Sequence, residues 1–307
     1  MTAAAPGAIA FSAQHLRGRF SDRTARLVSR AVLALVILIL AALLLRILHE
    51  AMPALGSALR SGGILRGDWA PVAEPPRFGL AHAIVSTVMV TALALALAVP
   101  IGFGIGLFTS EIAPPWLRSV LQPCLELLAG IPSVVYGFFG YVTLVAWFER
   151  HGGMATGESL LVAGLILAVM VLPFIAGVST ESFAAVPRLL KDSAHATGVT
   201  RLHVLRRIVV PVALPGLFAA VALGLGRAVG ETLAVLLLAG NSTALPTSYL
   251  HRGQPLTALI ATELPEAGLG SGKYHALYAA GLMLILIAVA INAVVWRLKA
   301  RLLRHGP

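Results

Sequence analysis

Long apolar runs constrain the fold of this chain more than any other feature of its sequence. Six long runs contain at most two charged residues each and are bounded by charged or turn residues. They cover residues 31–48, 82–108, 119–147, 160–178, 212–240 and 276–296. About 20 apolar residues in a helix cross the hydrocarbon core of a bilayer. The sequence therefore predicts an all-α, polytopic membrane protein with about six transmembrane helices.

Composition supports one membrane domain rather than two soluble ones. Hydrophobic residues make up 58% of the chain and charged residues 12%, against roughly 45–50% and 25% in soluble domains. The first run resembles a cleaved signal peptide in length, but thirty residues precede it and further apolar runs follow. It is therefore expected to be an uncleaved anchor. We expect the membrane domain to cover residues 31–297.

The positions of the basic residues predict how the chain lies in the membrane. A formal net charge of +10 would suit a nucleic-acid partner, but the basic residues cluster between apolar runs, so no nucleic acid is expected. Of the 23 Lys and Arg residues, fifteen fall on one side of the predicted membrane and six on the other. Basic residues accumulate on the cytoplasmic side, which predicts that both termini are cytoplasmic. Residues 1–30 are expected to form a mostly disordered basic tail and residues 298–307 a second basic tail.

The predicted cytoplasmic loop 180–208 is expected to form two helices joined by a turn. Pro187 suits a first helical turn, Gly198 a left-handed position that ends a helix, and Thr200 the cap of the next helix. An amphipathic helix lying on lipid headgroups is the alternative for such a basic loop.

The spacing of six residues in this loop resembles the loop motif of bacterial ABC importer permeases. That motif reads Glu-Ala-Ala, three residues, Gly, nine residues, Ile, two residues, Pro. The matching positions here are Asp192, Ser193, Ala194, Gly198, Ile208 and Pro211. Asp192 replaces the Glu and Ser193 the first Ala. The resemblance implies an ABC importer type I permease in which the short helix docks on a cytoplasmic ATPase, with Ala194, Ala196 and Gly198 as a small-residue knob.

Two ionisable residues inside the fifth run are candidates for substrate translocation. A charge at the bilayer centre costs about 2.5–3.5 kcal/mol, so Arg227 and Glu231 should face protein or water. An i, i+4 ion pair that locks helices together is the alternative, although base before acid is the weaker order. The planar fork of donors on Arg227 matches an oxyanion such as phosphate, and Glu231 would hold the guanidinium between passages. Thr232 completes this group.

Polar residues around Pro132 are weaker candidates. Pro132 is expected to kink the third span, and Ser133 and Tyr136 beside it would then be exposed to a permeating anion. Glu126 is ionisable at membrane depth, and a structural pairing with a basic residue is the favoured reading for it.

Three further segments resemble the phosphate-specific permeases of the Pst system. They are "GRAVGET" followed by "GN", "LLAGIPSVVYGFFG" at 127–140 and "VLPFIAGVS" at 171–179. The likeness runs from about residue 69 to residue 297 and is greater to the C subunit (PstC) than to the A subunit. It implies a heterodimer with a second permease subunit, two ATPase subunits and an extracytoplasmic phosphate-binding protein, in the bacterial cytoplasmic (inner) membrane.

The same resemblance implies that the chain is not an enzyme and binds no cofactor or metal of its own, because ATP and Mg²⁺ belong to the ATPase. The segment 268–274 resembles a phosphate loop, but Ala267 and Tyr274 stand where that loop needs Gly and Ser or Thr. Three alternatives stay open: a secondary transporter or channel, an ABC permease for another oxyanion, and a structural or sensing subunit.

Overall fold

The computed structural model describes the backbone of residues 7–61, 63, 68–152 and 156–304. Side chains are described for residues 24–56, 63, 68–152 and 156–301. The chain divides into two compact units, Met1–Glu50 and Ala51–Pro307, and each is considered by itself. Within the described residues, five helices are long and apolar enough to cross a membrane, or six if a bent helix pair is one span. The predicted all-α, polytopic fold is confirmed.

The first unit contains the part of α1 (Gly7–Ser61) up to Glu50, and with it most of the candidate span Thr24–Gly56. The predicted span 31–48 lies inside it. The backbone is helical from Gly7 onward; residues 1–6 lie outside the described part, and the mostly disordered basic tail stays a prediction. Many residues of this tail favour helix and none before Pro53 breaks it, so a helix nucleated in the apolar run extends towards the amino terminus.

The second unit holds four more candidate spans. They are α2 (Ala81–Leu107) with the π-helical turn η1 (Phe108–Ile112), α6 (Leu160–Ala184), the continuous run of α8 (Arg201–Val204), η3 (Leu205–Val209) and α9 (Val210–Gly230), and α12 (Gly272–Arg304). The predicted spans 82–108, 160–178 and 276–296 coincide with α2, α6 and α12. Three of the predicted spans in this unit are therefore confirmed as unbroken helices.

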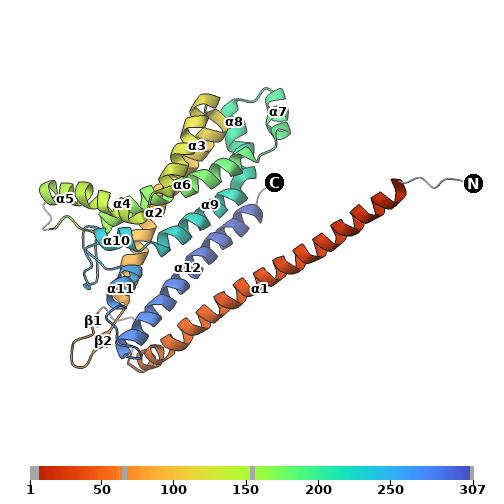
Figure 1. Ribbon diagram of the computed structural model, residues 1–307. Coiled ribbons are helices and arrows are strands. Elements are labelled where there is room, and N and C mark those ends of the chain that lie inside the picture. Colours follow the sequence, from red (N-terminus) through yellow and green to blue (C-terminus); the bar gives the residue numbers. More distant parts are fainter. Residues whose placement is uncertain (1–6, 62, 64–67, 153–155, 305–307) are drawn as a thin grey trace, which may run out of the picture. The chain divides into compact units, whose positions relative to one another are not determined.

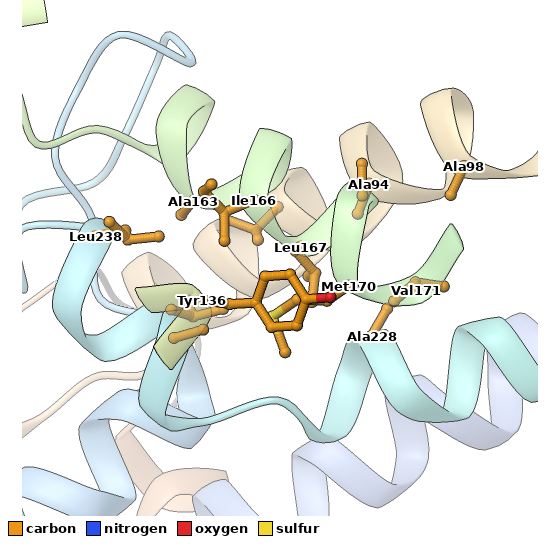
Figure 2. Packing of buried hydrophobic residues seen from close by; sticks show 14 of the residues in the cluster. Ala94, Ala98, Tyr136, Ala163, Ile166, Leu167, Met170, Val171, Ala228 and Leu238 are labelled. Carbon is orange, nitrogen blue, oxygen red and sulfur yellow. The ribbon is translucent and has the colours of Figure 1, made fainter. Parts of the chain in front are cut away.

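The core of the second unit is centred on α6, which packs along α2 and along α9. Figure 2 shows the ring of Tyr136 among the side chains of Leu167, Met170 and Ala228 in this core. Glycine brings α2 close to α6, because a Cβ at Gly106 would lie 2.6 Å from the Cβ of Ser179. Such contacts between small residues are typical of helices that pack in membranes.

The third predicted span is not one helix. It consists of α3 (Pro115–Gly130) followed, after a 90° bend, by the run of α4 (Ser133–Gly140), η2 (Tyr141–Val145) and α5 (Ala146–His151). Pro132 lacks an N–H and disfavours helical backbone at the residue before it, and Ile131 is extended with φ −66° and ψ 129°. The predicted kink at Pro132 is thus a full break between two helices.

The fifth predicted span, 212–240, is also wrong at both ends. Its helix begins earlier, at Arg201, and ends at Gly230, where Glu231 turns extended with φ −71° and ψ 131°. A short helix, α10 (Leu233–Leu238), follows. The hydroxyl of Thr257 donates to the carbonyl of Glu231 at 2.8 Å, which satisfies a backbone group that the break leaves free.

Two different structures lie at opposite ends of the second unit (Figure 1). One end carries the antiparallel pair β1 (Trp69–Ala70) and β2 (Arg77–Phe78) together with α11 (Leu256–Glu263). The other end carries α7 (Arg188–Ala196) and α8. The break in α9 lies beside α11, because Thr257 of α11 bonds the Glu231 carbonyl. The loop predicted to meet a partner and this break are therefore separate sites.

Candidate functional site

The loop at the α7 end has the helix–turn–helix form that its sequence predicts. Pro187 precedes the first turn of α7, Gly198 has a φ of +79°, and the hydroxyl of Thr200 accepts a hydrogen bond from the His203 amide at 3.4 Å. The second helix does not end in the loop, because α8 continues through η3 into α9. Any displacement of this turn therefore acts directly on the start of a membrane span.

The motif residues of this loop divide into an exposed and an inward-facing set. Asp192, Ser193, Gly198 and Pro211 are exposed. Ala194 and Ile208 are half-buried and pack against one apolar cluster; its buried members are Phe183, Val186, Val204, Val209, Ala213 and Leu217. Of the three residues in the predicted small-residue knob, Ala196 and Gly198 lie on the surface and Ala194 packs against the apolar cluster of its own chain; docking of the knob on an ATPase stays a prediction.

The outer surface of α7 also includes an apolar residue that the motif does not contain. The side chain of Leu189 is 75% exposed, and no residue of α7 is fully buried. Leu189 lies three residues before Asp192, so both belong to the outward surface of this short amphipathic helix. The amphipathic sequence of α7, with two leucines beside charged residues, was the signal that could have identified Leu189.

Arg227 lies in the last turn of α9 and is exposed on the surface of this chain. Its guanidinium carbon stands 4.8 Å from the centre of the Phe174 ring, on α6. The salt bridges found among the described residues include none between Arg227 and Glu231, and the role predicted for Glu231, to hold the guanidinium between passages, stays a prediction. The helix ends between the two residues, so they no longer have the i, i+4 relation that would bring them together.

The residues beyond the break in α9 take other positions. Glu231 is 9% exposed and its carbonyl is bonded by Thr257. Thr232 is half-buried and its hydroxyl donates to the Gly230 carbonyl at 3.4 Å. Both residues therefore shape the break, and their roles in translocation stay predictions.

The bend between α3 and α4 lies close to Arg227. Tyr136 donates from its hydroxyl to the Leu128 carbonyl at 2.9 Å, which links the two helices across the bend. Tyr136 packs in the same buried cluster as Ala228, the residue after Arg227. Ser133 is half-buried at the first turn of α4, four residues after Ala129. The structure thus brings Tyr136 close to the last turn of α9, which contains Arg227, whereas Ser133 lies only at the bend.

Phe174 also lines a cavity of about 230 Å³ whose walls come from α3, α6 and α9. Glu126 and Glu181 line the same cavity, and Glu126 also faces a more open hollow beside Ile131 and Pro132. The pairing predicted for Glu126 is absent from the salt bridges of the described residues. Sequence reasoning missed Phe174 and Glu181, although Phe174 lies in one of the three segments that carry the family resemblance.

This region combines a guanidinium over an aromatic ring with two carboxylates that line the neighbouring cavity. A guanidinium can stack its face on an aromatic ring while its N–H edge stays available to bind an oxyanion with two parallel hydrogen bonds. Phe174 supplies that ring here. Among the described residues, Arg227 contacts Phe174 and takes part in none of the salt bridges.

Known proteins resemble this chain over most of its length. A family model described as the binding-protein-dependent transport system inner membrane component matches residues 98–304. The phosphate transport system permease protein PstC of Haemophilus influenzae is 37% identical over 278 residues, covering 84% of this chain and 86% of that protein. The probable ABC transporter permease protein YqgH of Bacillus subtilis is 36% identical over 234 residues, covering 76% of each chain.

Solved structures confirm the fold. An inward-facing MetNI methionine ABC transporter has a TM-score of 0.52 at 19% identity, covering 73% of this chain and 94% of that chain. A bacterial ABC transporter involved in the import of the acidic polysaccharide alginate has a TM-score of 0.53 at 19% identity, covering 72% and 79%. The chain therefore belongs to the family of binding-protein-dependent transport system inner membrane components, as a multi-pass protein of the inner membrane.

Proposed function

We propose that this chain is a permease subunit of an ABC importer that moves inorganic phosphate across the inner membrane. The observation that carries the proposal is Arg227, exposed in a membrane span and stacked on Phe174. The choice of phosphate among oxyanions is supported by the 37% identity to PstC of Haemophilus influenzae.

A second permease subunit is part of this proposal. An arginine exposed on the surface of a span cannot face lipid without a large cost, so another chain or water must cover it. A heterodimer places Arg227 at the subunit interface, where a water-filled pathway can run. The catalytic work belongs to two ATPase subunits that bind ATP and Mg²⁺, and an extracytoplasmic phosphate-binding protein delivers the anion.

The α7 end of the second unit faces the cytoplasm in this proposal. Basic side chains gather there, and basic residues accumulate on the cytoplasmic side of membrane proteins. They are Arg118, Arg188, Lys191, Arg201, Arg206 and Arg207. The β1–β2 pair and α11 then face the outside, and both termini are cytoplasmic. Closure of the ATPase subunits would press on α7. Arg227, at first accessible from the outside, would then become accessible from the cytoplasm.

The proposal is tested with the complex in proteoliposomes, by measuring ATP-driven uptake of radiolabelled phosphate. A charge-assisted hydrogen bond is worth about 1.5–3 kcal/mol, so Arg227→Gln should lower uptake by about tenfold or more. Arg227→Lys, which keeps the charge but not the fork, should recover only part of it. ATPase copurification should stay unchanged in both variants.

Each alternative predicts a different result in the same experiment. Uptake by this chain without an ATPase would indicate a secondary transporter or channel. Unchanged uptake with Arg227→Gln would indicate a structural or sensing subunit. Competition by excess sulfate or phosphonate that equals competition by phosphate would indicate a permease for another oxyanion.

A further inference from the structure

The π-helical turn η1 at the end of α2 is bound by basic side chains from two other helices. Arg118, on α3, donates to the carbonyls of Thr109 at 2.9 Å and Ser110 at 2.7 Å. Arg201, the first residue of α8, donates to the carbonyl of Glu111 at 3.0 Å. Cations stabilise the free carbonyls at the carboxyl end of a helix, so these contacts fix α3 and α8 to the end of α2.

Glu111 makes a further contact through its side chain, to the loop helix α7. Its carboxylate forms an ion pair with Lys191 at 2.5 Å, and the two side chains are only 12% and 17% exposed. Lys191 and Ala194 lie three residues apart, on one face of α7, and are its only residues that are not exposed. The ion pair is therefore the polar half of the contact that holds α7 against the body of the chain.

The position of Glu111 makes it a junction between three helices. Its carboxylate meets α7, its carbonyl meets α8, and its backbone belongs to the end of α2. The only covalent link between α7 and α8 is a short turn that contains the left-handed Gly198. That turn connects α7 to one span, whereas the ion pair connects it to a second span 80 residues away in sequence.

We propose that Glu111 is a positioning residue that ties α7 to both α2 and α8, so that force applied to α7 moves two membrane spans together. This inference rests on the proposed function, in which α7 receives that force from an ATPase. Without the ion pair, α7 would rotate relative to α8 about the Gly198 turn. Motion of the ATPase would then move α7 without moving the two spans.

The tie has little part in holding the spans together. No residue of α7 is fully buried, so the helix adds little to the core. The close contacts of α2 with α6 lie elsewhere, at Gly102 against Ile175 and at Gly106 against Ser179. Loss of the ion pair should therefore leave the fold intact and change the coupling between ATP hydrolysis and transport.

The test is the ratio of phosphate transported to ATP hydrolysed by the whole complex in proteoliposomes. Glu111→Gln and Lys191→Met should each lower this ratio, on the order of tenfold, with ATP hydrolysis retained. The double variant should lose no more than either single one, because both changes remove one interaction. The matched control is the double variant Glu263→Gln with Lys273→Met. The Lys273 ammonium lies 2.6 Å from the Glu263 carboxylate at the other end of the unit, and the two side chains are 19% and 25% exposed. Loss of that pair should not change the ratio.

A covalent bridge supplies the complementary test. In a Cys124→Ser background, Glu111→Cys with Lys191→Cys should lower the ratio, and a bifunctional methanethiosulfonate of matching length should restore it. Three results would contradict the role proposed for the Glu111–Lys191 ion pair. The first is a double variant whose loss of the ratio equals the sum of the two single losses, and the second is a cross-link that stops uptake. The third is a ratio that stays unchanged in the variants while uptake and ATP hydrolysis fall together. An unsubstituted complex without ATP-driven phosphate uptake would instead overturn the proposed function, and the tie with it.

Discussion

At the residue scale, Arg227 is held by an aromatic ring and not by the carboxylate that its sequence neighbourhood offers. The guanidinium stacks on Phe174, and Glu231 lies beyond the end of the helix. A salt bridge would occupy the N–H edge that an oxyanion needs, whereas stacking uses only the face of the group. The aromatic partner therefore contacts Arg227 without occupying the N–H edge that the proposed anion needs.

Removal of the ring should weaken substrate binding. Cation–π contacts are worth about 0.5–2 kcal/mol, so Phe174→Leu should raise the KM for phosphate by about 2- to 30-fold. Leucine keeps most of the volume in the wall of the cavity, and Phe174→Tyr keeps the ring face as a control. Uptake kinetics in proteoliposomes measure the change. A KM in Phe174→Leu equal to that of the unsubstituted chain would show that the stacking is incidental.

At the scale of elements, two predicted spans are broken where polar function is expected. The α3–α4 bend follows from Pro132, which acts on its immediate neighbour. The break after α9 has no proline, and it is stabilised by Thr257 on a different helix. Broken helices are tolerated at membrane depth only where protein or water satisfies the backbone, so both breaks mark the region around Arg227 as protein-lined or hydrated.

The turn between α7 and α8 depends on a left-handed glycine. Gly198 has a φ of +79° and no atom within 4 Å of a Cβ built there, so a substitution is strained by backbone conformation alone. Gly198→Ala should cost about 1–2 kcal/mol in this conformation and lower ATPase copurification and uptake. Gly198→Asn, which adopts left-handed backbone more readily, should be milder. Equal effects of Ala and Asn would contradict the conformational argument.

At the scale of the whole molecule, the second unit presents two chemically different ends to the two sides of a membrane. The α7 end is basic and carries the continuous entry from the loop into a span. The opposite end carries the β1–β2 pair, with Val72 between the strands 95% exposed. This asymmetry suits a chain that meets one protein on each side of the membrane.

The proposed sidedness is checked by labelling single cysteines in intact cells. In a Cys124→Ser background, Val72→Cys should react with a membrane-impermeant maleimide. Leu298→Cys, at a position 48% exposed near the end of α12, should react only after the membrane is permeabilised. The opposite pattern would invert the topology and remove α7 from the reach of a cytoplasmic ATPase.

The sequence alone determined the membrane class, most of the spans, the helix–turn–helix loop and the family. Hydropathy, capping and proline act over a few neighbouring residues, so a local pattern is enough to predict them. Tertiary structure decided that Arg227 meets Phe174, that Ala194 faces inward and that Glu111 pairs with Lys191. These contacts join residues far apart in the chain, and their geometry depends on how the helices pack, which no local pattern specifies.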